Sequence, residues 1–135
     1  MTMLISMMLA AAAPSTAAPP PMPTDLSEVP VIENWQGRRV SPRWSEDVAR
    51  FYRKNKCTGA VPYEGSWLLE IDMLFLLAGD GTPMRIAPVN VQCTAVEKFV
   101  STRILGTLRN SFPKSGSSTP QWRRSQVRFL WSDAP

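Results

Sequence analysis

The sequence lacks histidine, has only two cysteines, and has few acids in its last third. Histidine is the commonest general base and the commonest metal ligand in proteins. Because it is absent, we expect neither an enzyme nor a resident metal ion or other cofactor. A nucleophilic Cys57 or Cys93 would have no histidine to activate it, which argues against a cysteine enzyme as well.

Acidic residues are scarce toward the C-terminal end. The 135-residue chain has a formal net charge of +4. From residue 98 onward the single acid is Asp133, whereas seven residues are basic: Lys98, Arg103, Arg109, Lys114, Arg123, Arg124 and Arg128. This distribution predicts a basic surface that suits an acidic partner, a nucleic acid or an anionic membrane face.

The apolar run at the start of the sequence is short. Residues 1–13 are rich in Met, Leu, Ile and Ala, and small residues follow to position 18, with no basic segment in front. As a helix this run spans about 20 Å, less than the roughly 30 Å of a bilayer core. We therefore interpret residues 1–18 as a signal peptide or short apolar leader. The alternatives are a disordered alanine-rich tail and a truncated anchor.

Export would place the two cysteines in an oxidising compartment, in the periplasm or outside the cell. A cysteine pair in a small exported domain is more often bridged than free. A bridge between Cys57 and Cys93 closes a loop of about 36 residues. In the chain-entropy description, a loop of that length stabilises the fold by about 3–4 kcal/mol. The sequence therefore predicts one disulfide.

Proline divides the chain into two parts. Residues 19–40 contain five of the 13 prolines among small and polar residues. Such a composition favours extended backbone and offers little apolar surface to bury. We expect residues 19–40 to form a disordered spacer and residues 41–135 to form a single folded domain.

The folded part begins with a predicted helix and a β-hairpin. Ser41 followed by Pro42 is typical of a helix N-terminus, and apolar residues recur on one face of the next turns. Residues 67–77 alternate in polarity, which predicts a half-buried strand. The pair Asp80-Gly81 predicts the hairpin turn, and Pro88 places the returning strand at a sheet edge or at a bulge.

A second helix and a last strand complete the predicted fold. Thr94 and Glu97 have the spacing of a capping box, which predicts a helix from Thr94 to about Asn110. Residues 121–131 alternate between apolar side chains and basic or amide side chains. The expected fold is α+β: a short helix, then a small antiparallel three-stranded sheet built from a β-hairpin, a helix and a strand, stapled by the disulfide.

This order of elements resembles a known family. The motifs that carry the resemblance are Leu69-Glu70-Ile71-Asp72-Met73 before Gly79-Asp80-Gly81, then Phe112-Pro113, and Val127-Arg128-Phe129 in the closing strand. Over about residues 41–131 they are similar to the periplasmic C-terminal domain of the TonB family and, more distantly, to that of TolA. The two cysteines resemble the bridge of TolA-like domains.

The resemblance implies a periplasmic protein-interaction domain. Such a domain binds an extended peptide of an outer-membrane transport protein or another envelope protein, which adds as a strand beside the last strand, and it implies a link to energy-dependent transport. The binding edge would consist of Gln121, Trp122, Arg124, Gln126 and Arg128. It is equally open that these arginines only protect an exposed edge from aggregation. The same edge also suits a homodimer.

Other function classes remain as alternatives. A secreted or periplasmic adaptor or inhibitor with no transport role would use the same scaffold. A small basic nucleic-acid-binding module would need Trp122 and Trp131 as stacking platforms, and export argues against it. We therefore expect a protein partner rather than nucleic acid, and membrane contact only through an uncleaved N-terminus. Glu70 and Asp72 share a strand face that fits a solvated surface better than a catalytic pair.

Overall fold

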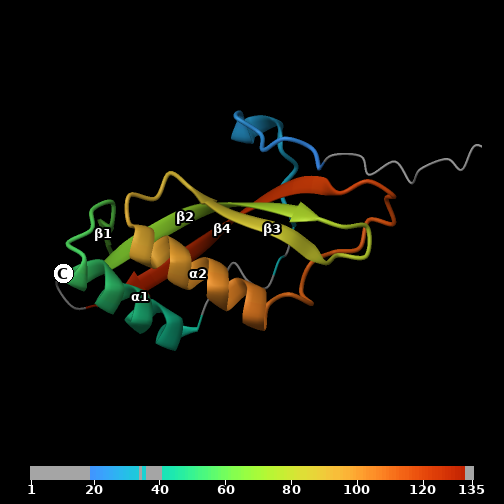
Figure 1. Cartoon of the computed structure of the whole chain (residues 1–135). Coiled ribbons are helices and arrows are strands. Elements are labelled where there is room, and N and C mark those ends of the chain that lie inside the picture. The colour runs from blue at the N-terminus through green and yellow to red at the C-terminus, as the bar shows by residue number, and fades with distance from the viewer. Residues whose placement is uncertain (1–18, 34, 36–40, 133–135) are drawn as a thin grey trace, which may run out of the picture.

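The computed structural model describes residues 19–33, 35 and 41–132, and the proposed leader at residues 1–18 lies outside them (Figure 1). The described part is α+β, as predicted, but its antiparallel sheet has four strands rather than three. Within these residues, no helix is both long and apolar enough to cross a membrane. In chain order the elements are the 3-10 helix η1 (Leu26–Glu28), α1 (Pro42–Lys54), β1 (Val61–Tyr63), β2 (Ser66–Leu77), β3 (Pro83–Val89), α2 (Thr94–Thr107) and β4 (Gln121–Trp131).

Strand β2 is the centre of the sheet. It pairs antiparallel with β4 along nearly its whole length, from Trp67 opposite Trp131 to Leu77 opposite Gln121. On its other side, β2 pairs with β1 near its start and with β3 near its end. Strands β1, β3 and β4 are therefore all outer strands of the sheet, and β3 and β4 are the two long ones.

The strand that sequence reasoning did not predict is β1. It forms a tight hairpin with β2 through Glu64 and Gly65, whose φ angles of 47° and 79° are both positive. Two consecutive positive φ angles are the geometry of a type I′ turn, which joins antiparallel strands. A three-residue strand is too short to show a periodic pattern, so the sequence carried no strong signal for it.

The predicted hairpin turn at Asp80-Gly81 is present between β2 and β3. Gly81 has a φ of 87°, and the Asp80 carboxylate accepts a hydrogen bond of 2.9 Å from the Thr82 amide. This hydrogen bond holds the pKa of Asp80 below its ordinary value. The tip of the hairpin also packs against the loop before β4, because the Gly79 carbonyl accepts from the Ser115 and Gly116 amides.

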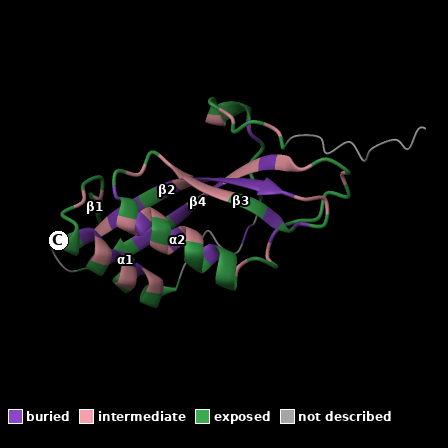
Figure 2. Cartoon of the chain, in the orientation of Figure 1, coloured by how far each residue is buried: buried purple, intermediate pink, exposed green. Residues whose placement is uncertain are grey.

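The main hydrophobic core lies between the sheet and the two α-helices (Figure 2). The alternation over residues 67–77 is confirmed, since the odd-numbered residues from Leu69 to Leu77 are buried in this core. Strand β4 contributes Val127, Phe129 and Trp131, also as predicted. Both strands therefore present one apolar face to α1 and α2, and within the described residues no α-helix lies on the opposite face of the sheet.

The helix boundaries follow the sequence signals only in part. Ser41 caps α1 through its hydroxyl, and Pro42 is the first helical residue, as expected. The N-cap of α2 is Cys93, which makes no side-chain capping bond, so the predicted capping box at Thr94 does not form. The Cys93 carbonyl accepts from the Glu97 amide, which leaves that amide unavailable to the Thr94 hydroxyl.

The predicted disulfide joins Cys57 to Cys93, with Cα atoms 5.5 Å apart. It ties the residues that follow α1 to the start of α2. A bridge that closes a 36-residue separation in a small domain is typical of an oxidising, non-cytoplasmic compartment.

The expectation of a disordered spacer is wrong for the described part of residues 19–40. Val29, Ile32 and Trp35 are each at most 7% exposed and belong to hydrophobic clusters. We call residues 20–33 and 35 the strap. Its prolines favour extended backbone, as expected, but an extended segment also lies flat on a sheet, and these three side chains supply the apolar surface that holds it there.

Candidate partner-binding edge

The strap begins on the face of the sheet that the α-helices leave uncovered (Figure 1). There Val29 packs in a small second cluster with Leu74, Leu76 and Trp122. The indole N–H of Trp122 donates a hydrogen bond of 3.1 Å to the Pro20 carbonyl. Trp122 is therefore a buried support for the strap.

The strap then crosses the outer edge of β4 at Arg124. The Arg124 amide donates to the Pro30 carbonyl at 3.0 Å, and the Ile32 amide donates to the Arg124 carbonyl at 2.9 Å. Val31 and Arg124 thus form one parallel bridge. The Arg124 side chain adds a third bond, from Nε to the Val29 carbonyl at 2.8 Å. At this one position the edge of β4 is already paired.

Beyond the edge, the strap enters the main core. The Trp35 ring lies 5.0 Å from Phe75 and 5.3 Å from Phe112, measured between ring centroids. Its indole N–H donates to the Ser111 hydroxyl at 2.9 Å. The strap is therefore anchored on both faces of the sheet, by Val29 on one and by Trp35 on the other.

The rest of the β4 edge is open among the described residues. In a strand, the backbone groups of alternate residues point to the same side. Because those of Arg124 point away from β2, those of Gln126, Arg128 and Leu130 do so too. Of these outward groups, only the Leu130 amide has a partner within the described part of the chain, namely the Ser45 hydroxyl of α1 at 3.2 Å. We call residues 126–130 of β4, with these outward N–H and C=O groups, the edge window.

The side chains beside the edge window include both basic and acidic groups. Arg128 pairs with Glu70 of β2 at 3.2 Å, with both side chains 41% exposed, and its guanidinium lies 5.8 Å from the Tyr63 ring centroid. Gln126 donates from Nε2 to the Asp72 carboxylate at 3.0 Å. Glu70 and Asp72 thus serve as partners of β4 side chains on the uncovered face, in keeping with a solvated surface.

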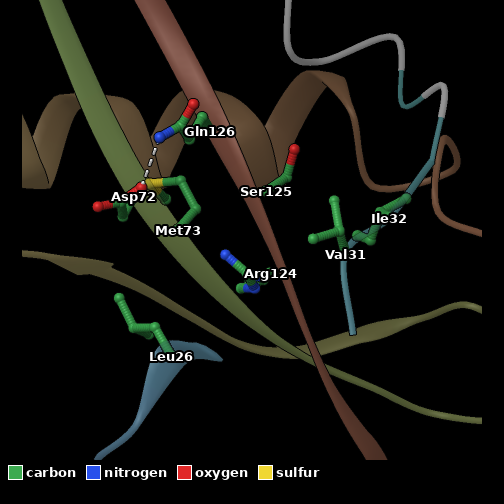
Figure 3. A pocket seen from close by; sticks show the side chains of 8 residues that line it. All are labelled: Leu26, Val31, Ile32, Asp72, Met73, Arg124, Ser125 and Gln126. Carbon is green, nitrogen blue, oxygen red and sulfur yellow. Dashed lines mark hydrogen bonds between the residues drawn. The ribbon is translucent and has the colours of Figure 1, made fainter. Parts of the chain in front are cut away.

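A cavity of about 260 Å³ lies between the strap and strands β2 and β4, next to the edge window (Figure 3). Its charged lining residues are Asp72 of β2 and Arg124 of β4, and Figure 3 shows both side chains. The remaining lining residues are Leu26, Val31, Ile32, Met73, Ser125 and Gln126. The cavity therefore combines an apolar wall with a guanidinium.

The structure separates the five residues of the predicted binding edge, which do not act together. Trp122 and Arg124 hold the strap, and the Gln121 side chain accepts a hydrogen bond from Arg123. Gln126 and Arg128 lie in the edge window. Sequence reasoning did not anticipate the strap, because the prolines around it indicate a spacer. The one signal was a set of apolar residues spaced three apart: Val29, Ile32 and Trp35.

No family model matches the chain, and no curated protein and no solved structure is significantly similar to it.

Among the described residues, no group of three or more histidine, cysteine, aspartate or glutamate side chains could hold a metal ion. Trp122 and Trp131 are 8% and 6% exposed, so neither offers an open ring face for a nucleic-acid base. The geometry of the β4 edge is therefore the feature on which a function can be based.

Proposed function

We propose that this chain is a TonB-like protein-interaction domain of the periplasm or extracellular space, which binds an extended segment of an envelope protein by strand addition at the edge window. The observation that carries the proposal is the row of outward backbone groups in the edge window, of which the N–H and C=O groups of Gln126 and Arg128 have no partner among the described residues. Unpaired backbone groups on an outer strand are a template for another strand, and main-chain hydrogen bonds then supply affinity.

The difference between the two long outer strands, β3 and β4, supports this assignment. Strand β3 contains Pro83 and Pro88, whereas β4 contains no proline between Gln121 and Trp131. Proline removes a backbone donor, and natural proteins use it to blunt sheet edges. Edge β3 is thus protected against an added strand, while β4 keeps its donors.

The disulfide supports an exported location, because such bridges persist in oxidising compartments. Apart from the additional strand β1, the structure keeps the order helix, hairpin, helix, strand on which the resemblance to TonB-like domains rests. Cleavage of a signal peptide and a link to energy-dependent transport are the further parts of this proposal.

Proline substitutions in the edge window test the proposal. Gln126→Pro and Arg128→Pro each remove one outward N–H while leaving the ladder to β2 intact, and Gln126→Ala and Arg128→Ala are the matched controls that keep the N–H. The probe is a peptide selected from a phage-displayed library of random dodecamers. We expect the proline variants to bind it about tenfold or more weakly, from the loss of a backbone hydrogen bond and steric exclusion.

Binding is measured by isothermal titration calorimetry, and amide exchange of Gln126 and Arg128 is followed by NMR. The bound peptide should slow exchange at these two amides, and urea unfolding checks that each variant is folded. If folded proline variants bind as tightly as the alanine variants, strand addition at the edge window is excluded.

A further inference from the structure

The position of the strap limits what the edge window can accept. We infer, on the basis of the proposed function, that the edge window binds the C-terminal end of its partner and that Arg124 binds the terminal carboxylate. The ligand class is thus a free chain end rather than an internal loop or linker.

The first step is the length of the edge window. Its lower limit is Arg124, whose amide and carbonyl are bonded to Pro30 and Ile32. Its upper limit is Leu130, whose amide is bonded to Ser45. Between these limits there is room for a strand of about five residues, or about 17 Å. A strand that adds here must end or leave the sheet at Arg124.

The second step asks whether a partner can displace the strap from Arg124, the lower limit of the edge window. The strap cannot move aside without exposing buried side chains on both faces of the sheet, since Val29 is 5% exposed on one face and Trp35 is 5% exposed on the other. Removing a buried tryptophan from a core is among the most destabilising changes that a small domain can undergo. The strap is therefore a fixed stop for an added strand.

The third step is the direction of the added strand. A strand antiparallel to β4 runs from Leu130 toward Arg124, so that its C-terminus arrives at the stop. Antiparallel ladders are slightly more stable per residue than parallel ones. They also match the ladders of β2 with β1, β3 and β4, which are all antiparallel, whereas the strap forms only a single parallel bridge at Arg124.

The fourth step is the positive charge of Arg124, which lies where the C-terminus of the added strand arrives. Among the described residues, Arg124 has no carboxylate partner, whereas Arg128 is paired with Glu70. Arg124 uses Nε for the neutral Val29 carbonyl, which leaves its two terminal amino groups for another acceptor. A guanidinium binds a carboxylate with short, charge-assisted bonds. A terminal carboxylate therefore complements Arg124.

The cavity beside Arg124 indicates the last side chain of the ligand. Its wall contains Leu26, Val31 and Ile32, and its one acid is Asp72, which already accepts from Gln126. Three aliphatic side chains on the wall suit an apolar side chain of the ligand. The final residue of the ligand is thus apolar, and the carboxylate that Arg124 binds belongs to the main chain.

The test compares peptides that differ only at their C-terminus, with the full chain as receptor. A peptide is selected from a library of random heptapeptides displayed with a free C-terminus, then synthesised as the free acid, as the amide, and with two added glycines. We expect the free acid to bind at least tenfold more tightly than the other two forms. Arg124→Met should remove this preference, and Arg85→Met, on β3, should keep it.

The outcomes separate the two proposals. If the amide or the extended peptide binds as tightly as the acid and still protects the Gln126 and Arg128 amides, chain-end recognition is wrong and strand addition stands. If no peptide from either library protects those amides, both are wrong. If Arg124→Met does not fold, the three peptide forms on the unchanged protein still decide, because they need no variant.

Discussion

Trp35→Ala tests whether the strap is part of the folded domain. The substitution removes a ring that is 5% exposed, its contacts with Phe75 and Phe112, and its hydrogen bond to Ser111. Large-to-small changes of a buried tryptophan typically cost about 3–5 kcal/mol. Since a domain of this size has about 5–10 kcal/mol of stability in all, we expect Trp35→Ala to lose a third or more of it.

The measurement is urea unfolding followed by far-UV circular dichroism, with the disulfide kept intact. For a small domain the free energy of unfolding falls by about 1–3 kcal/mol per molar urea, so the midpoint should drop by roughly 2 M. Val31→Ala is the matched control, because Val31 belongs to the same strap but is 51% exposed. Its cost should stay within about 0.5 kcal/mol.

A free energy of unfolding for Trp35→Ala within about 1 kcal/mol of the unchanged chain would refute this reasoning. That result would mean that the ring contributes no net packing energy, as the spacer interpretation of residues 19–40 requires. The fixed stop at Arg124 would then lose its support, because a strap that costs little to release can be displaced by a partner.

Two other predictions concern the sulfur bridge and the glycines. Reducing the Cys57–Cys93 bond should lower the free energy of unfolding by about 4 kcal/mol, measured by urea unfolding with and without dithiothreitol, and an unchanged midpoint would contradict the loop-closure estimate. Gly79→Ala should lower the free energy of unfolding by about 1–3 kcal/mol, because a Cβ there overlaps the Ser117 carbonyl. Gly106→Ala in α2, where a Cβ meets no atom, should raise the free energy of unfolding by up to about 1 kcal/mol. Thermal melts of the two variants measure both effects. Equal effects of the two changes would show that the hairpin tip does not touch the loop.

The sequence was sufficient for the elements that have a periodic signal. The alternation in residues 67–77 and 121–131 identified β2 and β4 together with their buried faces, and Asp80-Gly81 identified the turn between β2 and β3. The disulfide followed from composition. In each case the physical cause is local: side-chain period, turn conformation, or the chemistry of two cysteines.

The features that the sequence did not reveal depend on contacts between distant residues. Strand β1 is defined by its pairing with β2, and the strap by bonds from Pro20 to Trp122 and from Val29 to Arg124. A proline-rich segment has the same composition whether it is free or lies on a sheet. The position of β4 at the edge of the sheet could be predicted, but the part of that edge that the strap occupies could not.

The strap and β4 together set the order in which the molecule can be assembled. Their hydrogen bonds join residues 95 and 102 positions apart, and the bond from Ser45 to Leu130 spans 85. Until β4 has been synthesised, β2 lacks its longest neighbour and the N-terminal segment has no edge to cross. The complete fold therefore forms only after nearly the whole of this sequence has been synthesised. A polypeptide that folds late stays unfolded for longer, and an unfolded chain is the form that can pass through a translocation pore.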